Sequence, residues 1–170
     1  MAEWVETFKG AVLAAEYDRE AFMNSQIYVS RFDQATWFLL GTIGLTPKTC
    51  KKRKRRIAVV RQNFQYLREL QGGELVVVKS GFVAVGRKHF RFVHQMYDQE
   101  SGRMVATSDV TAVEASLATG RTQALPASYR KSAEGLLVTS NVDADKVEAK
   151  TSSPAGRKTP AKKKKAAKKK

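Results

Sequence analysis

The sequence predicts an α+β domain in which an antiparallel five-stranded sheet wraps around one long central helix. One stretch near the N-terminus has helical periodicity, and four strand-like runs separated by turn residues follow it. A short apolar run before the helix supplies the fifth strand. We place one folded domain over residues 1–138, followed at 139–170 by a tail rich in Lys, Ala and Pro that is too polar to build a core.

The first strand is expected between Phe8 and Tyr17, where a short apolar run is bounded by charged residues. A polar loop starting at Asp18 follows, and Asn24 or Ser25 can cap the next helix. The helix itself is predicted by apolar residues that recur every three or four positions: Tyr28, Phe32, Ala35, Leu39 and Ile43. We expect it to end near Gly41, Gly44 and Pro47.

The remaining strands are predicted from four runs that turn residues separate. Because short turns connect these runs, neighbours in sequence are expected to pair as antiparallel hairpins in a meander. A short terminal helix is expected after Pro126. The four runs are Ile57 to Leu67, Glu74 to Val85, His89 to Tyr97 and Arg103 to Leu117.

Cysteine and histidine usage argues against a metal site. Cys50 is the only cysteine, which excludes an internal disulfide and fits a reducing compartment. His89 and His94 are five positions apart, an odd spacing, so on one strand they point to opposite faces and cannot share a metal. We expect His94 to be a core or interface residue. The N-terminus lacks the features of a signal peptide and no run is long enough to span a membrane, so a cytoplasmic protein is expected.

The run from Asp18 to Tyr28 places an acid immediately before the long helix. A helix start collects free N–H groups and positive dipole potential, so this acid can serve as a cap or as part of a reaction site. Asp18, Asn24 and Tyr28, followed by Phe32 and Ala35, resemble the D-x-x-G-H-x-N-N-x-x-Y signature of hot-dog-fold acyl-CoA thioesterases of the 4-hydroxybenzoyl-CoA thioesterase type. The resemblance covers about residues 5 to 130, and the order of elements matches.

The resemblance implies a thioester hydrolase with the hot-dog fold. Asp18 falls on the family's catalytic aspartate, a nucleophile or a general base for water. Backbone N–H groups around Asn24 and Ser25 would hold the carbonyl oxygen. Neither a metal nor another cofactor is implied. The sequence departs from the signature where Ala21-Phe22 replaces Gly-His and where Ser25 replaces the second Asn.

The same resemblance implies how substrate and subunits are arranged. An acyl-CoA would contact Phe22 and Tyr28, although both types of aromatic side chain are common in cores. Arg87 and Lys88, at a hairpin turn, are positioned for the phosphates of coenzyme A or for solvent. A single hot-dog subunit leaves its site incomplete, so a homodimer or homotetramer is expected. A dehydratase of the same fold is disfavoured because its usual His and acid pairing is not evident.

Two basic blocks hold the net charge of +15. Residues 51–56 contribute six positive charges, and residues 146–170 contain eleven basic residues against one acid, which leaves the rest near neutral. The first block can be a solvated loop, a docking point for coenzyme A phosphates, or a nuclear-localisation or nucleic-acid patch. The second resembles the lysine-rich tails of linker histones and histone-like bacterial proteins. The alternative function is therefore a non-catalytic hot-dog dimer whose tails bind nucleic acid or acidic partners.

Overall fold

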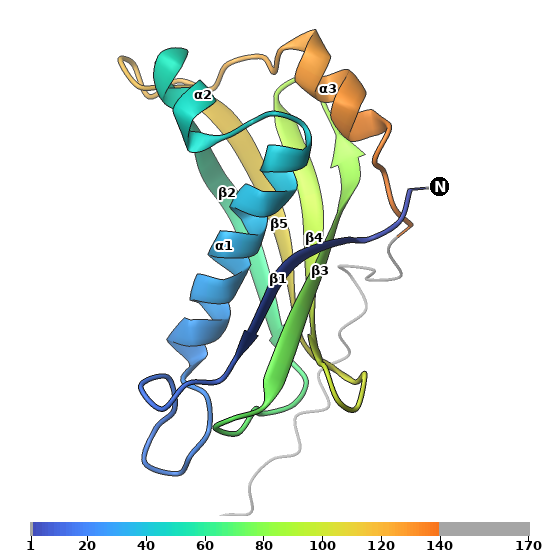
Figure 1. The fold of residues 1–170 in the computed structure, drawn as a ribbon. Coiled ribbons are helices and arrows are strands. Elements are labelled where there is room, and N and C mark those ends of the chain that lie inside the picture. Colours follow the sequence, from blue (N-terminus) through green and yellow to red (C-terminus); the bar gives the residue numbers. More distant parts are fainter. Residues whose placement is uncertain (1, 140–170) are drawn as a thin grey trace, which may run out of the picture.

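The computed structural model describes residues 2–139, which form a curved sheet around one long helix (Figure 1). The elements in chain order are β1 (Val5–Ala11), α1 (Ser25–Thr42), α2 (Pro47–Lys52), β2 (Arg55–Tyr66), β3 (Leu75–Val85), β4 (His89–Asp98), β5 (Met104–Ser116) and α3 (Ala127–Glu134). The predicted α+β fold with an antiparallel five-stranded sheet is confirmed. The predicted tail at 139–170 lies outside the described residues, except for its first residue.

The order of strands in the sheet is β1-β3-β4-β5-β2, with every neighbouring pair antiparallel. The meander prediction therefore holds for β3, β4 and β5 and is wrong for β2, which pairs with β5 at the far edge. The reason lies in the β2–β3 connection, residues 67–74, which buries Leu70 completely. This buried leucine makes the connection a packed crossing from the edge strand β2 to the interior strand β3, whereas a hairpin turn would be exposed.

The first strand lies closer to the N-terminus than the sequence predicted. Its ladder with β3 ends at the pair Ala11 and Leu75, because β3 begins at Leu75 and offers no further partner. Of the apolar run that suggested the strand, Val12 is buried in the following loop and Leu13 is 58% exposed. The apolar character of that run reflects one core residue at a strand end.

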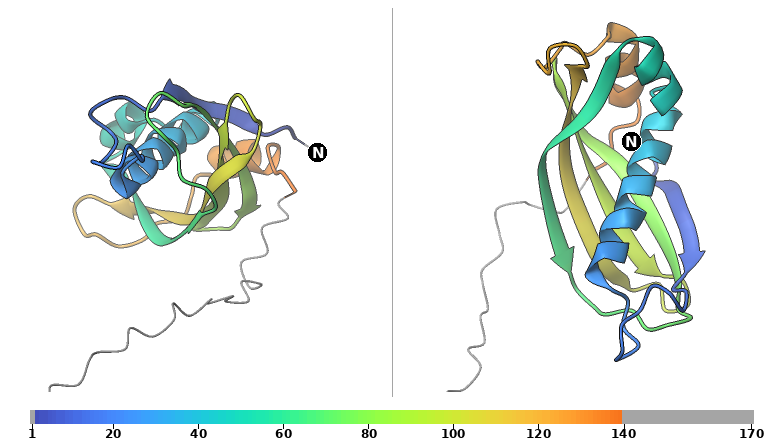
Figure 2. Two further views of the ribbon diagram at one scale, coloured as in Figure 1. Left: turned by 90° about the horizontal axis from the view of Figure 1, so that it is seen from below. Right: turned by 90° about the vertical axis from the view of Figure 1, so that its left-hand side faces the viewer.

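Helix α1 follows the prediction closely. The side-chain oxygen of Asn24 accepts a hydrogen bond from Gln26 N–H at 3.0 Å, which makes Asn24 the N-cap. The predicted apolar stripe is buried, and the helix packs on β1, β3 and β4 with β1 and β2 at the two edges of the sheet (Figure 2). Gly44, with φ of +79°, follows the helix end.

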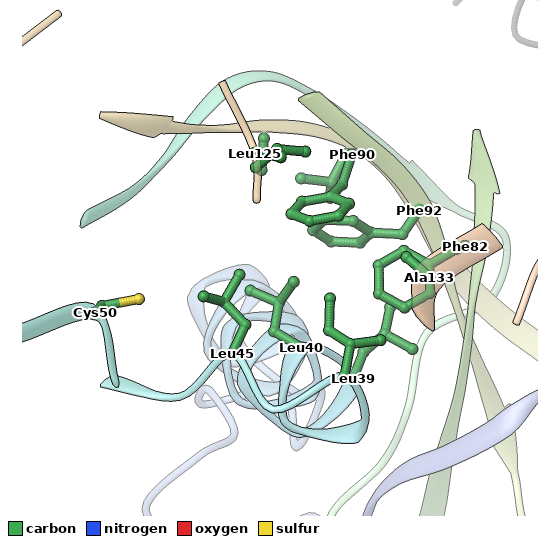
Figure 3. Close-up of a cluster of buried hydrophobic side chains, with 12 residues drawn as sticks. Leu39, Leu40, Leu45, Cys50, Phe82, Phe90, Phe92, Leu125 and Ala133 are labelled. Carbon is green, nitrogen blue, oxygen red and sulfur yellow. The ribbon is translucent and has the colours of Figure 1, made fainter. Parts of the chain in front are cut away.

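Two hydrophobic clusters fill the space between α1 and the sheet. The upper cluster places Leu39, Leu40 and Leu45 opposite Phe82, Phe90 and Phe92 (Figure 3). The lower cluster is built around Phe32 and Tyr28 at the start of the helix. His94 lies between them, stacked on Phe32 at 5.8 Å between ring centroids.

Two shorter helices lie at the upper end of the domain as drawn in Figure 1. Thr46 and Thr49 form a reciprocal capping box and Pro47 is the first residue of α2, so Pro47 starts a helix after α1 has ended. The basic block, expected as a loop, instead spans the end of α2, a turn and the start of β2. The predicted helix after Pro126 is present as α3. No helix of residues 2–139 is long and apolar enough to cross a membrane.

Candidate active site

The loop between β1 and α1 is held firmly at both ends. Val12 N–H donates to the carbonyl of Glu74 at 2.9 Å, and Met23 N–H donates to the carbonyl of Leu70 at 2.7 Å. The side chains of Val12 and Met23 are both buried. The segment between Val12 and Met23, which carries Asp18, is therefore a short loop anchored at both ends.

Asp18 is exposed at the tip of this loop and organises a tight turn. Its Oδ1 accepts hydrogen bonds from Glu20 N–H at 2.9 Å and from Phe22 N–H at 3.1 Å. Its own N–H donates to the carbonyl of Phe22 at 2.9 Å. Oδ2 accepts no hydrogen bond from the described residues. The carboxylate therefore has one oxygen committed to the turn and one oxygen open to a ligand.

Ala21 occupies a backbone conformation that normally selects glycine. Its φ of 65° lies in the left-handed region, which costs an L-residue about 1–2 kcal/mol. This position is the one at which the thioesterase signature has glycine. Here the turn has the conformation that favours glycine while carrying a residue that is strained in it. Phe22, the second departure, is half-buried at the base of the turn, and its backbone groups hold Asp18 on both sides.

The helix start offers one free backbone donor. Asn24 N–H donates to the carbonyl of Glu16 at 2.9 Å, and Gln26 N–H donates to the Asn24 side chain. Ser25 N–H, between them, donates to no group of the described residues. If an oxyanion site exists here, its donor is therefore the N–H of Ser25, supported by the dipole of α1.

The contacts of Tyr28 identify it as a core residue. Its hydroxyl accepts a hydrogen bond from Leu70 N–H at 3.1 Å and donates to the carbonyl of Arg68 at 3.5 Å. Burial raises the pKa of this hydroxyl, and its ring packs edge-on against Tyr66 at 5.3 Å. Tyr28 thus fixes the β2–β3 connection under the helix start, with no polar atom left for a substrate.

A half-buried ion pair supports the loop, and the sequence analysis did not find it. Arg31 Nη2 lies 2.6 Å from Glu16 Oε2 and donates to the carbonyl of Ala11 at 3.1 Å. The guanidinium also lies over the ring of Phe8, 4.5 Å from its centroid. A signal was available, because Arg31 lies three residues after Tyr28 and beside Phe32, on the predicted apolar face of the helix. A charge there requires a buried partner.

Arg87 and Lys88 lie far from Asp18 within one subunit. They form the exposed turn between β3 and β4 at the upper end of the sheet, whereas the Asp18 loop is at the lower end (Figure 1). The 11 residues of β3 separate the two ends by roughly 35 Å. One protomer therefore does not bring these predicted residues together with the acid.

The two histidines do lie in opposite environments. His89 is exposed, whereas His94 is fully buried, with Nδ1 2.6 Å from Ser80 Oγ and Nε2 2.9 Å from Thr36 Oγ1. Burial lowers the pKa of His94 to about 3, so the ring is neutral. Within residues 2–139, no cluster of three or more His, Cys, Asp or Glu side chains could hold a metal ion.

The β2 edge exposes apolar side chains beside the open side of α1. Val59, Val60, Tyr66 and Leu67 are about half exposed, and Trp37 on the helix is 38% exposed. A surface hollow of 460 Å³ lies elsewhere, at the lower edge formed by β1 and β3, and none of the predicted site residues lines it. Asp18 thus lies on an open surface of the single subunit.

Comparisons with known proteins identify a matching family and solved structures of similar fold. Residues 12–135 match the family model of the thioesterase-like superfamily. A hypothetical protein of Staphylococcus aureus, solved in complex with CoA, superposes with a TM-score of 0.75 at 18% identity, over 82% of this chain and 89% of that chain. The 1,4-dihydroxy-2-naphthoyl-CoA thioesterase of Synechocystis gives 0.66 at 13% identity, over 74% and 92%.

A probable thioesterase of Escherichia coli superposes with a TM-score of 0.64 at 19% identity, over 77% of this chain and 98% of that chain. Searching the curated protein sequences gave no significant match. These structural likenesses establish a shared hot-dog fold at low sequence identity.

Proposed function

Because the chain belongs to the thioesterase-like superfamily, we propose that it hydrolyses an acyl-CoA thioester to the free acid and coenzyme A, with Asp18 as the reacting carboxylate. The observation that carries this proposal is the geometry of the loop before α1. There an exposed acid with one free oxygen precedes a helix whose Ser25 N–H is unused. The reaction needs both features, a base or nucleophile and a fixed donor for developing negative charge.

Two routes use the same groups. As a general base, Asp18 takes a proton from water while the oxygen of that water bonds to the thioester carbonyl carbon. The carbonyl oxygen becomes negative and accepts the hydrogen bond of Ser25 N–H. The C–S bond then breaks, the acid is released, and the proton passes to the coenzyme A thiolate. As a nucleophile, Asp18 bonds through a carboxylate oxygen to the carbonyl carbon, and the C–S bond breaks to release coenzyme A thiolate. Water then hydrolyses the resulting mixed anhydride, which frees the acid and Asp18 and supplies the proton of the thiol.

A second subunit completes the site in this proposal. Among residues 2–139, no strand pairs with the outer edge of β2, and this edge carries the exposed apolar residues Val59, Val60, Tyr66 and Leu67. This combination favours covering by another strand. Two-fold pairing of this edge with itself is antiparallel, so the upper end of one subunit lies beside the lower end of its partner. Arg87 and Lys88 would then reach coenzyme A phosphates near the Asp18 of the other subunit.

The two aromatic residues predicted to contact substrate, Phe22 and Tyr28, differ in burial and in proposed role. Phe22 is half-buried beside the acid and is our candidate for contact with the acyl group. Tyr28 shapes the floor through packing, since its hydroxyl is fully engaged. The CoA bound to the Staphylococcus aureus structure supports a coenzyme A ester as the substrate class. A homodimer or homotetramer in the cytoplasm remains our expectation.

Asp18→Asn and Asp18→Ala together separate catalysis from turn stability. An asparagine Oδ1 can still accept the hydrogen bonds from Glu20 and Phe22 N–H, whereas alanine loses both and should destabilise the turn by about 1–2 kcal/mol. We expect both variants to lose at least about 100-fold in turnover of the preferred acyl-CoA, with the melting temperature lowered only by alanine. The measurement is release of free thiol across short, long and aromatic acyl-CoAs.

Glu20→Gln is the matched control, because it removes the charge of an exposed acid in the same loop. It should retain the native turnover. If Asp18→Asn hydrolyses every thioester as fast as the native chain, Asp18 is a turn-forming residue only. In that case the alternative is the better account, a non-catalytic hot-dog dimer that binds nucleic acid or acidic partners through its lysine-rich tail.

A further inference from the structure

The folded domain is strongly polarised along its long axis. We define the cationic end as the upper end in Figure 1, where α2, the start of β2, the β3–β4 turn, the loop after β5 and α3 meet. These segments contain twelve basic residues and one acid, Glu134, and the end of β5 beside them adds Glu114. The basic residues are Lys48, Lys51, Lys52, Arg53, Lys54, Arg55, Arg56, Arg87, Lys88, Arg121, Arg130 and Lys131.

Backbone hydrogen bonds hold these segments together at one end of the sheet. Leu117 N–H donates to the carbonyl of Lys54 at 3.0 Å, and Leu125 N–H donates to the carbonyl of Arg87 at 2.9 Å. Residues separated by more than 30 positions in the sequence are therefore parts of one surface. Most of the basic side chains on it, including Lys48, are exposed.

The opposite end carries the opposite charge. The loops at residues 12–24, 67–74 and 98–103 contain seven acids and three arginines. The near-neutral sum that applies outside the two basic blocks therefore conceals a separation of charge, and residues 51–56 add to the positive end. This separation arises because β-strand ends alternate between the two edges of the molecule, so distant sequence segments add their charges.

The cationic end is not neutralised from within the domain. Of its twelve basic residues, only Arg53 forms an ion pair with an acid of the described chain, Glu114 at 2.6 Å. So many unpaired charges repel one another unless an anion is bound.

The chemistry of this surface identifies the kind of anion. Coenzyme A presents a few phosphates at one point, which Arg87 and Lys88 could satisfy, leaving the basic residues on the α2 side of this end without a partner. An exposed aromatic side chain for stacking unpaired bases is missing from the described part of this end. Leu117 is the only large apolar side chain exposed there, too little to enter a lipid bilayer. A long, regular array of phosphates matches a basic surface of this extent.

We propose that the cationic end, centred on Lys48, Lys51 and Lys52 of α2, binds the phosphate backbone of double-stranded DNA without sequence preference. Backbone binding of this kind releases condensed counterions, so its affinity falls steeply with salt. The binding uses residues outside the Asp18 loop and does not depend on thioester hydrolysis.

The test compares two triple variants of the full-length chain that carry the same net charge. The first carries Lys48→Gln, Lys51→Gln and Lys52→Gln at the cationic end. The second carries Arg19→Gln, Arg61→Gln and Arg103→Gln, which are exposed basic residues away from it. Binding to a fluorescent duplex of about 25 base pairs is followed by anisotropy over a series of salt concentrations, and melting temperatures verify folding.

For the first variant we expect the slope of log K against log salt to become shallower by about 2.7, since each lost phosphate contact removes about 0.9. Its affinity at the lowest salt should fall at least tenfold, and the second variant should bind like the native chain. Equal binding by the two variants would overturn the proposal. So would a preference for single-stranded oligonucleotide, or binding to phosphatidylserine vesicles without binding to the duplex.

Discussion

Replacing Ala21 by glycine should stabilise the domain, although glycine substitutions in loops usually destabilise. The turn that holds Asp18 forces Ala21 to a φ of 65°, where a Cβ atom crowds the following carbonyl. Glycine removes that crowding. Ala21 is exposed, so its methyl group contributes little buried apolar surface that the change would forfeit.

The expected magnitude is the difference between two effects. Relief of the left-handed backbone contributes about 1–2 kcal/mol to the free energy of unfolding. The greater freedom of glycine in the unfolded chain removes about 0.4–1 kcal/mol. The net stabilisation is therefore about 0.5–1 kcal/mol, which raises the melting temperature by about 2–4 °C in a domain of this size.

Ala14→Gly is the control for this reasoning. Ala14 is exposed in the same loop, and its backbone is not in the left-handed region. It should therefore lose about 0.4–1 kcal/mol. Urea denaturation of both variants measures the two free energies. A destabilised Ala21→Gly, equal in sign and size to Ala14→Gly, would refute the claim that the turn stores backbone strain.

Two further predictions concern the core and the C-terminal segment. Because burial lowers the pKa of His94 from 6.5 to about 3, the unfolded chain binds a proton that the folded chain excludes. The contribution of neutral His94 to the free energy of unfolding should thus be complete above pH 6.5 and fall by up to about 1.4 kcal/mol per pH unit as the pH drops toward 3. Denaturation curves of His94→Gln should lack this pH dependence. An unchanged slope in the variant would contradict the prediction. A Cβ atom at Gly81 would overlap both methyl groups of Val138, so Gly81→Ala should lower the melting temperature and Val138→Ala should rescue the double variant; additive losses would count against this contact.

The boundaries of α1 could be predicted because their causes are local. The apolar period and the capping side chain of Asn24 lie within the helix or next to it, so no distant residue is needed to define them. The extents of β2 to β5 and the presence of α3 followed for the same reason. The strand order did not, because pairing of β2 with β5 depends on how Leu70 packs beneath the helix.

Some features of the candidate site could likewise be predicted from local sequence, and others could not. That an acid precedes a helix start is a property of the sequence, and so are the departures at Ala21 and Phe22. The tight turn that engages one oxygen of Asp18, and the Glu16 and Arg31 pair that supports the loop, depend on contacts between segments far apart in the chain. The sequence therefore identified the candidate residues but not which of their atoms remain free.

By itself the sequence determined the α+β class, the long capped helix and the acid in front of it, because periodicity and capping are encoded within a few residues. Only the tertiary structure decided that Arg87 and Lys88 lie at the end opposite Asp18 and that basic residues from distant segments gather at one end of the domain. The electrostatic potential at a surface is the sum over all charges near it in space, and folding brings together residues that are far apart in the sequence.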